Sequence, residues 1–419
     1  MRPARGCGVI GAAPKSAERS SAVRLTRLIP ALGVAQIISW GTLFYAIAVL
    51  GEGMRNDLAL SSTWLFGAFT LGLLLSGAAS PIVGRLVDEK GGRFVLSWGS
   101  IIAALALAAI ASARGAIALF LGWALAGIAM AACLYDPAFV TLHQLTGKRY
   151  RSAVTALTLF GGFASTVFWP VSQWLLDAVG WRDTLWIYAA LHLGICLPLH
   201  LGLVPKPQAI ASAGAPGDDE AILARARDDH RPHANRAIYF WLAAALSVAA
   251  FLSATLSAHL IAMLKAAGMT AGEAVIVSSL IGPMQVAGRI AEFAFARRFS
   301  AIQMGALAFA LMTAGMICLA LVDGFAATAF VFAILYGWSN GVMTIVRGTV
   351  PAVLFGTRDY GALLGRLALP AFVAKAIAPV AFASILAAAL PREAQLWGLA
   401  LGAAIALAAY WLATGDRQR

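Results

Sequence analysis

Gly84-Arg-Leu-Val-Asp88-Glu-Lys-Gly91-Gly-Arg93 is a short, charged and glycine-rich stretch between two long apolar runs, residues 64–83 and 95–113. Each run is about 20 residues long, which is the length that an α-helix needs to cross the apolar core of a bilayer. A polar stretch of this size between two such runs predicts a tight loop that joins two membrane-spanning helices. The stretch therefore indicates a helical membrane protein.

Composition supports the same fold class along the whole chain. Hydrophobic residues make up 61% of the sequence, charged residues only 12%, and the mean hydropathy is +0.81, which excludes an ordinary soluble domain. Twelve apolar runs of spanning length recur. They cover approximately residues 28–50, 64–83, 95–113, 116–142, 153–175, 184–203, 237–264, 271–295, 303–321, 325–346, 367–390 and 396–413. We therefore expect an all-α protein of twelve transmembrane helices.

One polar segment, residues 205–236, interrupts this pattern and divides the chain in two. It carries Asp218-Asp-Glu220, Asp228-Asp229, several arginines and little apolar material, which is typical of a flexible linker. The predicted organisation is an arm at 1–27, a six-helix bundle at 28–204, the linker at 205–236, a second six-helix bundle at 237–413 and a tail at 414–419.

The basic residues predict the orientation, because short loops rich in Lys and Arg stay on the cytoplasmic side. Most of the net charge of +12 lies in the arm and in alternate loops, whereas the other loops carry single arginines or lysines beside acids. We expect both termini in the cytoplasm, in a membrane of the bacterial inner-membrane type. The arm shows no cleavage site for a signal peptide, and no soluble basic domain suggests nucleic-acid binding.

The two halves resemble each other in sequence. A shift of 204 positions places Gly84 over Gly288, Asp136 over Asn340 and His143 over Arg347. The same shift of 204 positions thus aligns the second apolar run with the eighth and the fourth with the tenth. This predicts a duplicated six-helix unit and a pseudo-symmetric pair of bundles.

With these residues in place, the chain resembles a major facilitator superfamily transporter. The loop motif of that family, G-x-L-x-D-basic-x-G-basic-basic, matches at Gly84, Leu86, Asp88, Gly91 and Arg93, and it departs at Glu89 and Gly92. The resemblance implies that the aspartate faces the N-terminus of the eleventh helix and helps to close the cytoplasmic side, where a carboxylate is favoured by the helix dipole. Gly84, Asp88, Gly91 and Arg93 are thus the predicted gate residues; the alternative is a solvated turn.

Within the superfamily, the chain is similar to the monocarboxylate-transporter-like branch. The similar residues are Ser39-Trp-Gly-Thr-Leu-Phe-Tyr45, Gly180-Trp-Arg182 and Gly288-Arg289. The branch implies that Arg289 binds a substrate carboxylate and that Gln285, four positions earlier, occupies a position involved in proton coupling. If Arg289 is that arginine, the loop glycine of the second half falls at Phe293 rather than Gly288, and both registers remain open.

Charged residues inside apolar runs are the other candidates. An arginine near the bilayer centre costs about 2.5 to 3.5 kcal/mol, so it persists where it pairs or binds a ligand. Arg289 and Glu292 lie near one helical face, and a salt bridge between them is the alternative to anion binding. Asp136 is a candidate proton site, with a fixed ion pair to Arg347 as its alternative. Lys375 has three alternative roles. It offers a second positive charge to an anion, it pairs with Asp136 or Glu292, or its side chain extends to the membrane–water interface.

Three polar residues complete the candidate substrate site. His259 lies in the outer part of the seventh helix, Tyr45 at the position from which the branch reaches its substrate, and Asn340 in the tenth helix. For His259 and Tyr45, helix packing is the alternative.

The predicted function is alternating-access transport of a small organic anion with a proton. Substrate contacts are assigned to Arg289, Gln285, His259, Tyr45, Asn340 and Lys375, and proton coupling to Asp136 and Glu292. The alternatives are proton-driven efflux of a hydrophobic or toxic compound and, more remotely, a membrane sensor. The sequence contains no nucleotide loop, metal cluster or nucleophile triad, so we expect a protein that is not an enzyme and needs no cofactor or metal. We also expect it to be a monomer in the bilayer.

Overall fold

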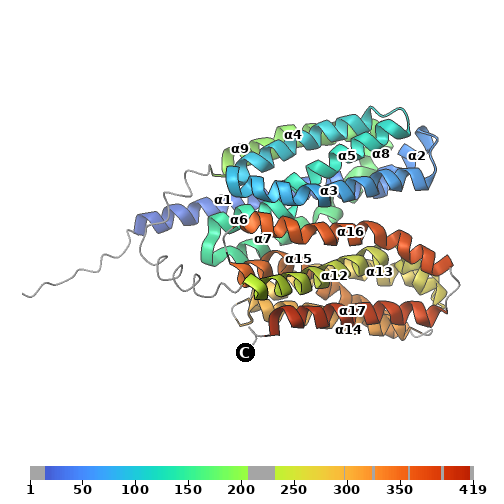
Figure 1. The fold of residues 1–419 in the computed structure, drawn as a ribbon. Helices are drawn as coiled ribbons and strands as arrows, with labels where there is room; N and C mark the ends of the chain where they lie inside the picture. Colours follow the sequence, from blue (N-terminus) through green and yellow to red (C-terminus); the bar gives the residue numbers. More distant parts are fainter. Residues whose placement is uncertain are drawn as a thin grey trace, which may run out of the picture.

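The computed structural model describes residues 15–205, 232–296, 298–322, 326–356, 359–387 and 391–415, and within these ranges the chain is helical with no strand. Figure 1 shows the helices running side by side in two groups, one for each half of the sequence. The predicted all-α membrane fold is confirmed. The predicted linker falls mostly on residues 206–231, which lie outside the described residues, as do residues 1–14 and 416–419.

The first half contains spans that are broken into shorter helices. The helices are α1 (Lys15–Ser39), η1 (Trp40–Tyr45), α2 (Ala46–Asp57), α3 (Ser62–Lys90), α4 (Gly92–Ala111), α5 (Ala116–Cys133), α6 (Tyr135–Thr146), η2 (Gly147–Arg149), α7 (Tyr150–Gly162), α8 (Ala164–Leu191), η3 (His192–Cys196) and α9 (Leu197–Leu203). Two of these, η1 and η3, are π-helical segments, which appear frequently at functional sites.

The second half is built from six long helices. They are α12 (Pro232–Ala266), α13 (Ala271–Phe295), α14 (Ala301–Ala320), α15 (Ala326–Phe355), α16 (Tyr360–Ala387) and α17 (Arg392–Thr414). Helix α15 continues nine residues beyond the predicted end at 346, and α16 begins seven residues before the predicted start at 367. Each extra segment contains one arginine, Arg347 or Arg366, among mostly apolar residues and glycines, and the apolar runs were ended at these charges.

The described residues contain 11 helical stretches that are long and apolar enough to cross a membrane, and one of them covers 54 residues from Tyr150 to Leu203. Gly180 interrupts that stretch, because its φ of 81° lies in the left-handed region that favours glycine. The stretch is therefore two spans, and the total of twelve agrees with the prediction.

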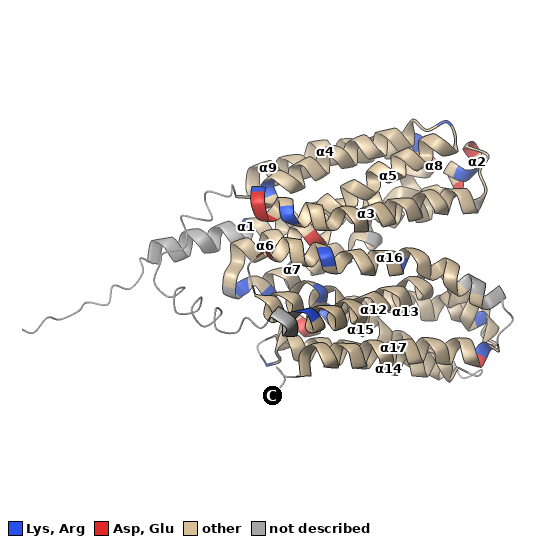
Figure 2. Cartoon of the chain, viewed as in Figure 1, with Lys and Arg blue, Asp and Glu red and all other residues tan. Residues whose placement is uncertain are grey.

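The ends of the spans define two faces of the molecule. We call the end at which α9 stops, α12 starts and α17 stops the terminal face, and the other end the opposite face. Figure 2 shows charged residues gathered near these two ends, with long uncharged stretches between them. Each half has an apolar core of its own, with a further cluster of apolar side chains where the two halves meet near the terminal face.

Two arginines hold the loops of the opposite face, one in each half. Arg182 donates to Asp57 (2.8 Å) and to the carbonyl oxygens of Ala111 and Ala113 at the end of α4. Arg392, 210 positions later, donates to the carbonyl oxygens of Ala266 and Val322 at the ends of α12 and α14. Because the two arginines bind matching helix ends, the pseudo-symmetry predicted from sequence is present in the fold.

Replacing Arg182 by leucine is expected to lower the free energy of unfolding by about 2 to 3 kcal/mol, because several charge-assisted hydrogen bonds and the contact with the Trp181 ring are lost together. The apparent melting temperature in detergent measures this loss. Arg114→Ala is the control, since Arg114 is exposed on the same face. Equal melting temperatures for the two variants would contradict the structural role of Arg182.

Candidate functional site

The carboxylate of Asp88 joins the two halves at the terminal face. Its Oδ1 accepts from the backbone N–H of Gly361 (3.0 Å) and its Oδ2 from that of Ala362 (2.9 Å), in the first turn of α16. The free N–H groups and the positive end of the helix dipole both favour a carboxylate there. This is the placement that the family resemblance implies, and the gating role itself stays a prediction.

Glycines in the same stretch permit the close approach of α3 and α16. A Cβ at Gly84 would collide with the carbonyl group of Gly361, and Gly91, with φ of 79°, ends α3. Gly92 replaces a basic residue of the family motif because a side chain there would meet Thr141. Arg93 is half-buried beside it. The departure at Gly92 therefore has a local packing cause.

Gly84→Val is expected to prevent the terminal face from closing, since the added methyl groups would displace α16. The measurement is alkylation of a cysteine introduced at Ser80, which is 3% exposed between α3 and α16. We expect the cysteine to be protected in the parent protein and to react at least 10-fold faster with Gly84→Val. Gly67→Ala is the control on the same helix, because a Cβ there meets only Phe120 at 3.5 Å. Unchanged protection would show that the interface tolerates the bulk.

Glu292 makes the corresponding contact from the second half. Its Oε1 lies 2.7 Å from Nε of Arg151, its Oε2 accepts from the hydroxyl of Thr155 (2.6 Å), and its side chain is 1% exposed. Arg151 also donates to the carbonyl oxygens of Ala296 and Phe299. The alternative salt bridge between Arg289 and Glu292 is therefore wrong, because the carboxylate is occupied by Arg151 and Thr155.

The positions of Asp88 and Glu292 also favour one of the two sequence registers. They are 204 residues apart, which is the shift that aligns Gly84 with Gly288. Both carboxylates reach from the terminal end of a span into the first turns of a span in the other half, α16 for Asp88 and α7 for Glu292. The Gly84–Gly288 register therefore describes the structure, and Phe293 as the loop glycine position does not, so a substrate role for Arg289 depends on its own surroundings and not on the register of the monocarboxylate-transporter-like branch.

A third contact joins α6 to α15. Asp136 forms an ion pair with Arg347, as the alternative reading of the sequence expected. Close by, the Tyr150 hydroxyl donates to the carbonyl oxygen of Gly348 (2.6 Å), and the His143 ring stacks on Tyr360 at 4.3 Å between centroids. The void left beside Asp136 and Gly84 has about 10 Å³, so the two halves leave no room for a ligand at this point of the terminal face.

Arg289 lies deeper than these contacts, in α13, and is 6% exposed. Its Nη1 donates to the carbonyl oxygen of Thr158 (3.3 Å) and lies where a Cβ at Gly162 would stand. Its Nε has no protein partner among the described residues. The guanidinium is in electrostatic reach of the hydroxyls of Tyr45 and Tyr135. Arg289 therefore retains donor capacity for a ligand.

Aromatic rings surround this guanidinium on the side of the first half. Trp40 and Tyr45 belong to the π-helical segment η1; the Trp40 ring packs against Tyr135 of α6, and the Tyr45 ring packs against Trp40. Tyr45 also meets Trp169 of α8, with 6.1 Å between ring centroids. Gly161 leaves room for the Tyr135 hydroxyl. The hydroxyls of Tyr45 and Tyr135 thus lie near Arg289, and the Trp169 ring lies next to Tyr45.

Lys375 supplies another cation in the middle of α16. Its Nζ lies 4.8 Å from the centroid of the Phe44 ring, in electrostatic reach of Asp136 and Arg347. Around the centre, four cations (Arg151, Arg289, Arg347 and Lys375) face two carboxylates (Asp136 and Glu292), each already in an ion pair. Arg289 and Lys375 form no ion pair among the residues that the structure describes.

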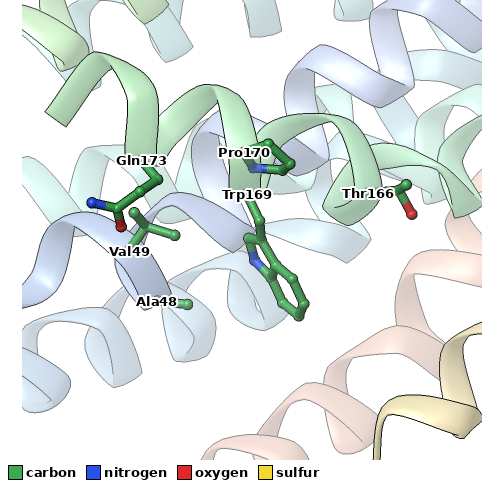
Figure 3. A pocket seen from close by; sticks show the side chains of 6 residues that line it. All are labelled: Ala48, Val49, Thr166, Trp169, Pro170 and Gln173. Atoms are coloured by element: carbon green, nitrogen blue, oxygen red, sulfur yellow. The ribbon is translucent and has the colours of Figure 1, made fainter. Parts of the chain in front are cut away.

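A cavity of about 510 Å³ opens beside this region towards the opposite face. It is lined by Ala48, Val49, Thr166, Trp169, Pro170 and Gln173. Figure 3 shows these side chains coming from α2 and α8, with the indole of Trp169 standing beside α2. The cavity is shallow and open, since Thr166, Trp169, Pro170 and Gln173 are all exposed. Because Trp169 contacts Tyr45, the cavity borders the surroundings of Arg289.

The remaining predicted residues lie at different places. Gln285 and Asn340 are half-buried on α13 and α15, and Gly341 packs against the backbone of Gln285. His259 donates from Nε2 to the carbonyl oxygen of Pro379 (2.9 Å) and packs on Phe382. The structure thus gives His259 the helix-packing contact of the alternative reading, and the substrate roles of all three stay predictions.

Sequence reasoning missed Arg151, Thr155, Tyr135 and Trp169. For the first two, a signal was present: the shift of 204 aligns Asp88 with Glu292, so Glu292 should contact the start of the fifth span as Asp88 contacts that of the eleventh. For the aromatic residues there was none, because Tyr135 and Trp169 look like ordinary apolar residues in apolar runs.

Comparison with known proteins agrees with this geometry. The sequence profile of the Major Facilitator Superfamily matches residues 32–327. Monocarboxylate transporter 11 of Mus musculus is 33% identical over 143 residues, which are 34% of this chain and 31% of that protein. Monocarboxylate transporter 13 of Rattus norvegicus is 26% identical over 292 residues, 69% of this chain and 65% of that protein. The chain thus aligns with less than two thirds of the length of either transporter.

A solved structure shows the same fold. The proton:xylose symporter XylE bound to 6-bromo-6-deoxy-D-glucose superposes with a TM-score of 0.70 at 14% identity, covering 93% of this chain and 96% of that one. At this identity the likeness shows the arrangement of the helices, and the ligand of that protein carries no information about the site here.

Proposed function

Because the chain belongs to the Major Facilitator Superfamily and is a membrane transporter, we propose that it moves a small organic anion, such as a monocarboxylate, together with a proton by alternating access. The observation that carries this proposal is the excess of two positive charges at the centre. Arg289 and Lys375 have no carboxylate partner there among the described residues. A buried charge without a partner is costly, and an anionic substrate supplies one.

Arg289 is the proposed carboxylate ligand. A guanidinium offers donors in a planar fork that fits a carboxylate, and its Nε and the nearby tyrosine hydroxyls are placed for further hydrogen bonds. Lys375 adds charge without a fixed geometry. The apolar cavity with Trp169 then takes the body of the anion, so the proposal extends to carboxylates with an aliphatic or aromatic group.

Asp136 and Glu292 are the proposed proton carriers. Each forms an ion pair that joins the two halves near the terminal face, Asp136 with Arg347 and Glu292 with Arg151. Protonation of either carboxylate would weaken the contact and favour opening of that face. This links proton binding to the conformational change, as coupled transport requires. If the terminal face is cytoplasmic, as the positive loops predict, the described conformation accepts substrate from outside.

The alternative is proton-driven efflux of a hydrophobic compound, and the apolar lining of the cavity favours it. The two functions differ in what the central cations do. In the efflux function Arg289 and Lys375 only hold the structure, and a carboxylate is not required on the substrate.

Uptake into proteoliposomes separates the two functions. We would present labelled carboxylates from acetate to aromatic acids under an inward proton gradient, with and without a protonophore. Gradient-dependent accumulation of a carboxylate, and none of its amide, supports anion and proton cotransport. No accumulation of any carboxylate by folded protein, together with proton-driven removal of an apolar dye, would replace the proposal by efflux.

A further inference from the structure

Two histidines are buried inside the first half, away from the candidate site. His192 and His200 are 0% exposed and lie with Cys196 at four-residue intervals, so the three share one face of the sixth span. This face packs against the first span, which provides Gln36, Ser39 and Thr42, and against Ser100 of α4. We call the interior between these residues the histidine seam.

Hydrogen bonds define which nitrogen of His192 carries the proton. We assign the Thr42 hydroxyl hydrogen to the carbonyl oxygen of Ile38 (2.8 Å), which can only accept, so that Thr42 Oγ1 accepts in its 2.9 Å contact with Nε2 of His192. Nε2 therefore holds the hydrogen, and Nδ1 of a neutral ring is an acceptor. Nδ1 is buried and has no protein partner among the described residues.

His200 repeats this arrangement with its ring nitrogens exchanged. Ser100 donates to the carbonyl oxygen of Leu96 (3.1 Å), so Ser100 Oγ accepts from Nδ1 of His200 (3.0 Å). Nε2 of His200 is then the acceptor, and it too is buried without a protein partner in the described chain. Both imidazoles thus direct a lone pair into the interior.

The seam contains further buried polar groups without a protein hydrogen bond among the described residues, one of them the Ser39 hydroxyl, which can donate or accept. Gln36 uses its Nε2 on the carbonyl oxygens of Cys133 and Leu134, where α5 ends and α6 begins, which leaves its Oε1 buried and unpartnered among described residues. The Cys133 thiol donates to Ala129. Residues 28–51, α4 and α5 contain no Asp or Glu that would favour a charged imidazole.

We propose that the histidine seam binds ordered water molecules, which donate hydrogen bonds to Nδ1 of His192 and Nε2 of His200. A buried acceptor without a donor costs about 1 to 3 kcal/mol, and water bound to polar groups is the usual way in which proteins avoid that cost. A metal ion does not fit, because the described residues provide no group of three or more suitable ligands. A proton is not favoured either, because among the described residues the polar partners of the two rings are hydroxyl groups and not carboxylates.

The proposed water site lies where the helices around it are irregular. It borders the π-helical segments η1 and η3 and the break at Leu134, so three spans are irregular around it. Irregular turns leave backbone groups that water can satisfy. The inference does not depend on the transported substrate.

Solid-state NMR of the full chain in lipid bilayers, with ring-15N histidine, tests the proposal. Thr42→Val and Ser100→Ala remove the hydroxyls and identify the two rings by the shift of their N–H resonances. We expect neutral rings at pH 7, with the hydrogen on Nε2 of His192 and on Nδ1 of His200. We expect magnetisation transfer from water to Nδ1 of His192 and to Nε2 of His200.

His259 is the control, since its ring contacts Pro379 in the second half and neither substitution should move its resonances. Rings that show no transfer from water would overturn the proposal, because the acceptors would then be dry. Doubly protonated rings at pH 7 would overturn it as well and would make the seam a proton site. If a variant does not fold, His200→Gln replaces it. Loss of the water contact at position 200, with the contact at His192 retained, would then support two separate water sites.

Discussion

Arg289→Gln is expected to lower kcat/KM for carboxylate uptake by about 100-fold or more. The variant removes a charge-assisted contact to a buried carboxylate, which is worth about 3 kcal/mol, and each 1.4 kcal/mol corresponds to a factor of ten. Glutamine keeps a donor and much of the volume, so the interface with Thr158 and Gly162 should persist. Proteoliposome uptake and binding of unlabelled carboxylate by isothermal calorimetry measure the effect.

Two variants control this experiment. Arg289→Lys keeps the charge and loses the planar fork, so it should retain partial activity with a raised KM. Arg114→Gln, at an exposed position, should leave uptake unchanged. Full activity of Arg289→Gln, with normal folding and melting temperature, would show that the arginine is only structural and would favour the efflux function.

Glu292→Gln is expected to shift the population towards conformations in which the terminal face is open. Removing one partner of a buried ion pair costs about 3 to 5 kcal/mol, because Arg151 keeps its charge. A change of 3 kcal/mol alters the ratio of two conformations by about 150-fold. Spin labels at positions 149 and 298, both exposed beside this contact, would report the change as a longer interspin distance.

Glu273→Gln is the matched control for this variant. Glu273 lies on the same helix at the opposite face, is exposed and caps the helix through Thr270, so its loss should not open the terminal face. An unchanged distance distribution in Glu292→Gln would mean that the Asp88 and Asp136 contacts hold the face closed without it.

The sequence was most informative where a feature is local. Length and hydropathy predicted twelve spans because crossing a bilayer requires about 20 apolar residues whatever the neighbours are. The stretch from Gly84 to Arg93 predicted a loop between two spans, and the family resemblance, rather than the stretch itself, implied that Asp88 contacts the eleventh span. The length of a span and the polarity of a loop both depend on residues that are adjacent in sequence.

Features that depend on distant residues were less predictable. Glu292 was assigned to proton coupling or to Arg289, although its partner is Arg151, 141 positions earlier. Lys375 was expected to offer charge to an anion, to pair with a carboxylate or to reach an interface; it lies against the Phe44 ring, in electrostatic reach of Asp136 but without an ion pair among the described residues. The aromatic surroundings of Arg289 depend on the π-helical turn at η1, and a single extra residue in a turn leaves no mark on hydropathy.

The hydrogen bonds and ion pairs between the two halves, among the residues that the structure describes, all lie between Arg289 and the terminal face. At the opposite face, Arg182 and Arg392 act within their own halves. Because these contacts hold the two halves together near the terminal face, we expect the opposite face to be the accessible one in this conformation. If the proposed site is correct, we expect ligands from that side to reach it without a change of conformation, whereas ligands from the terminal side should first require the contacts between the halves to break. An inhibitor should consequently act much faster from one side of the membrane than from the other.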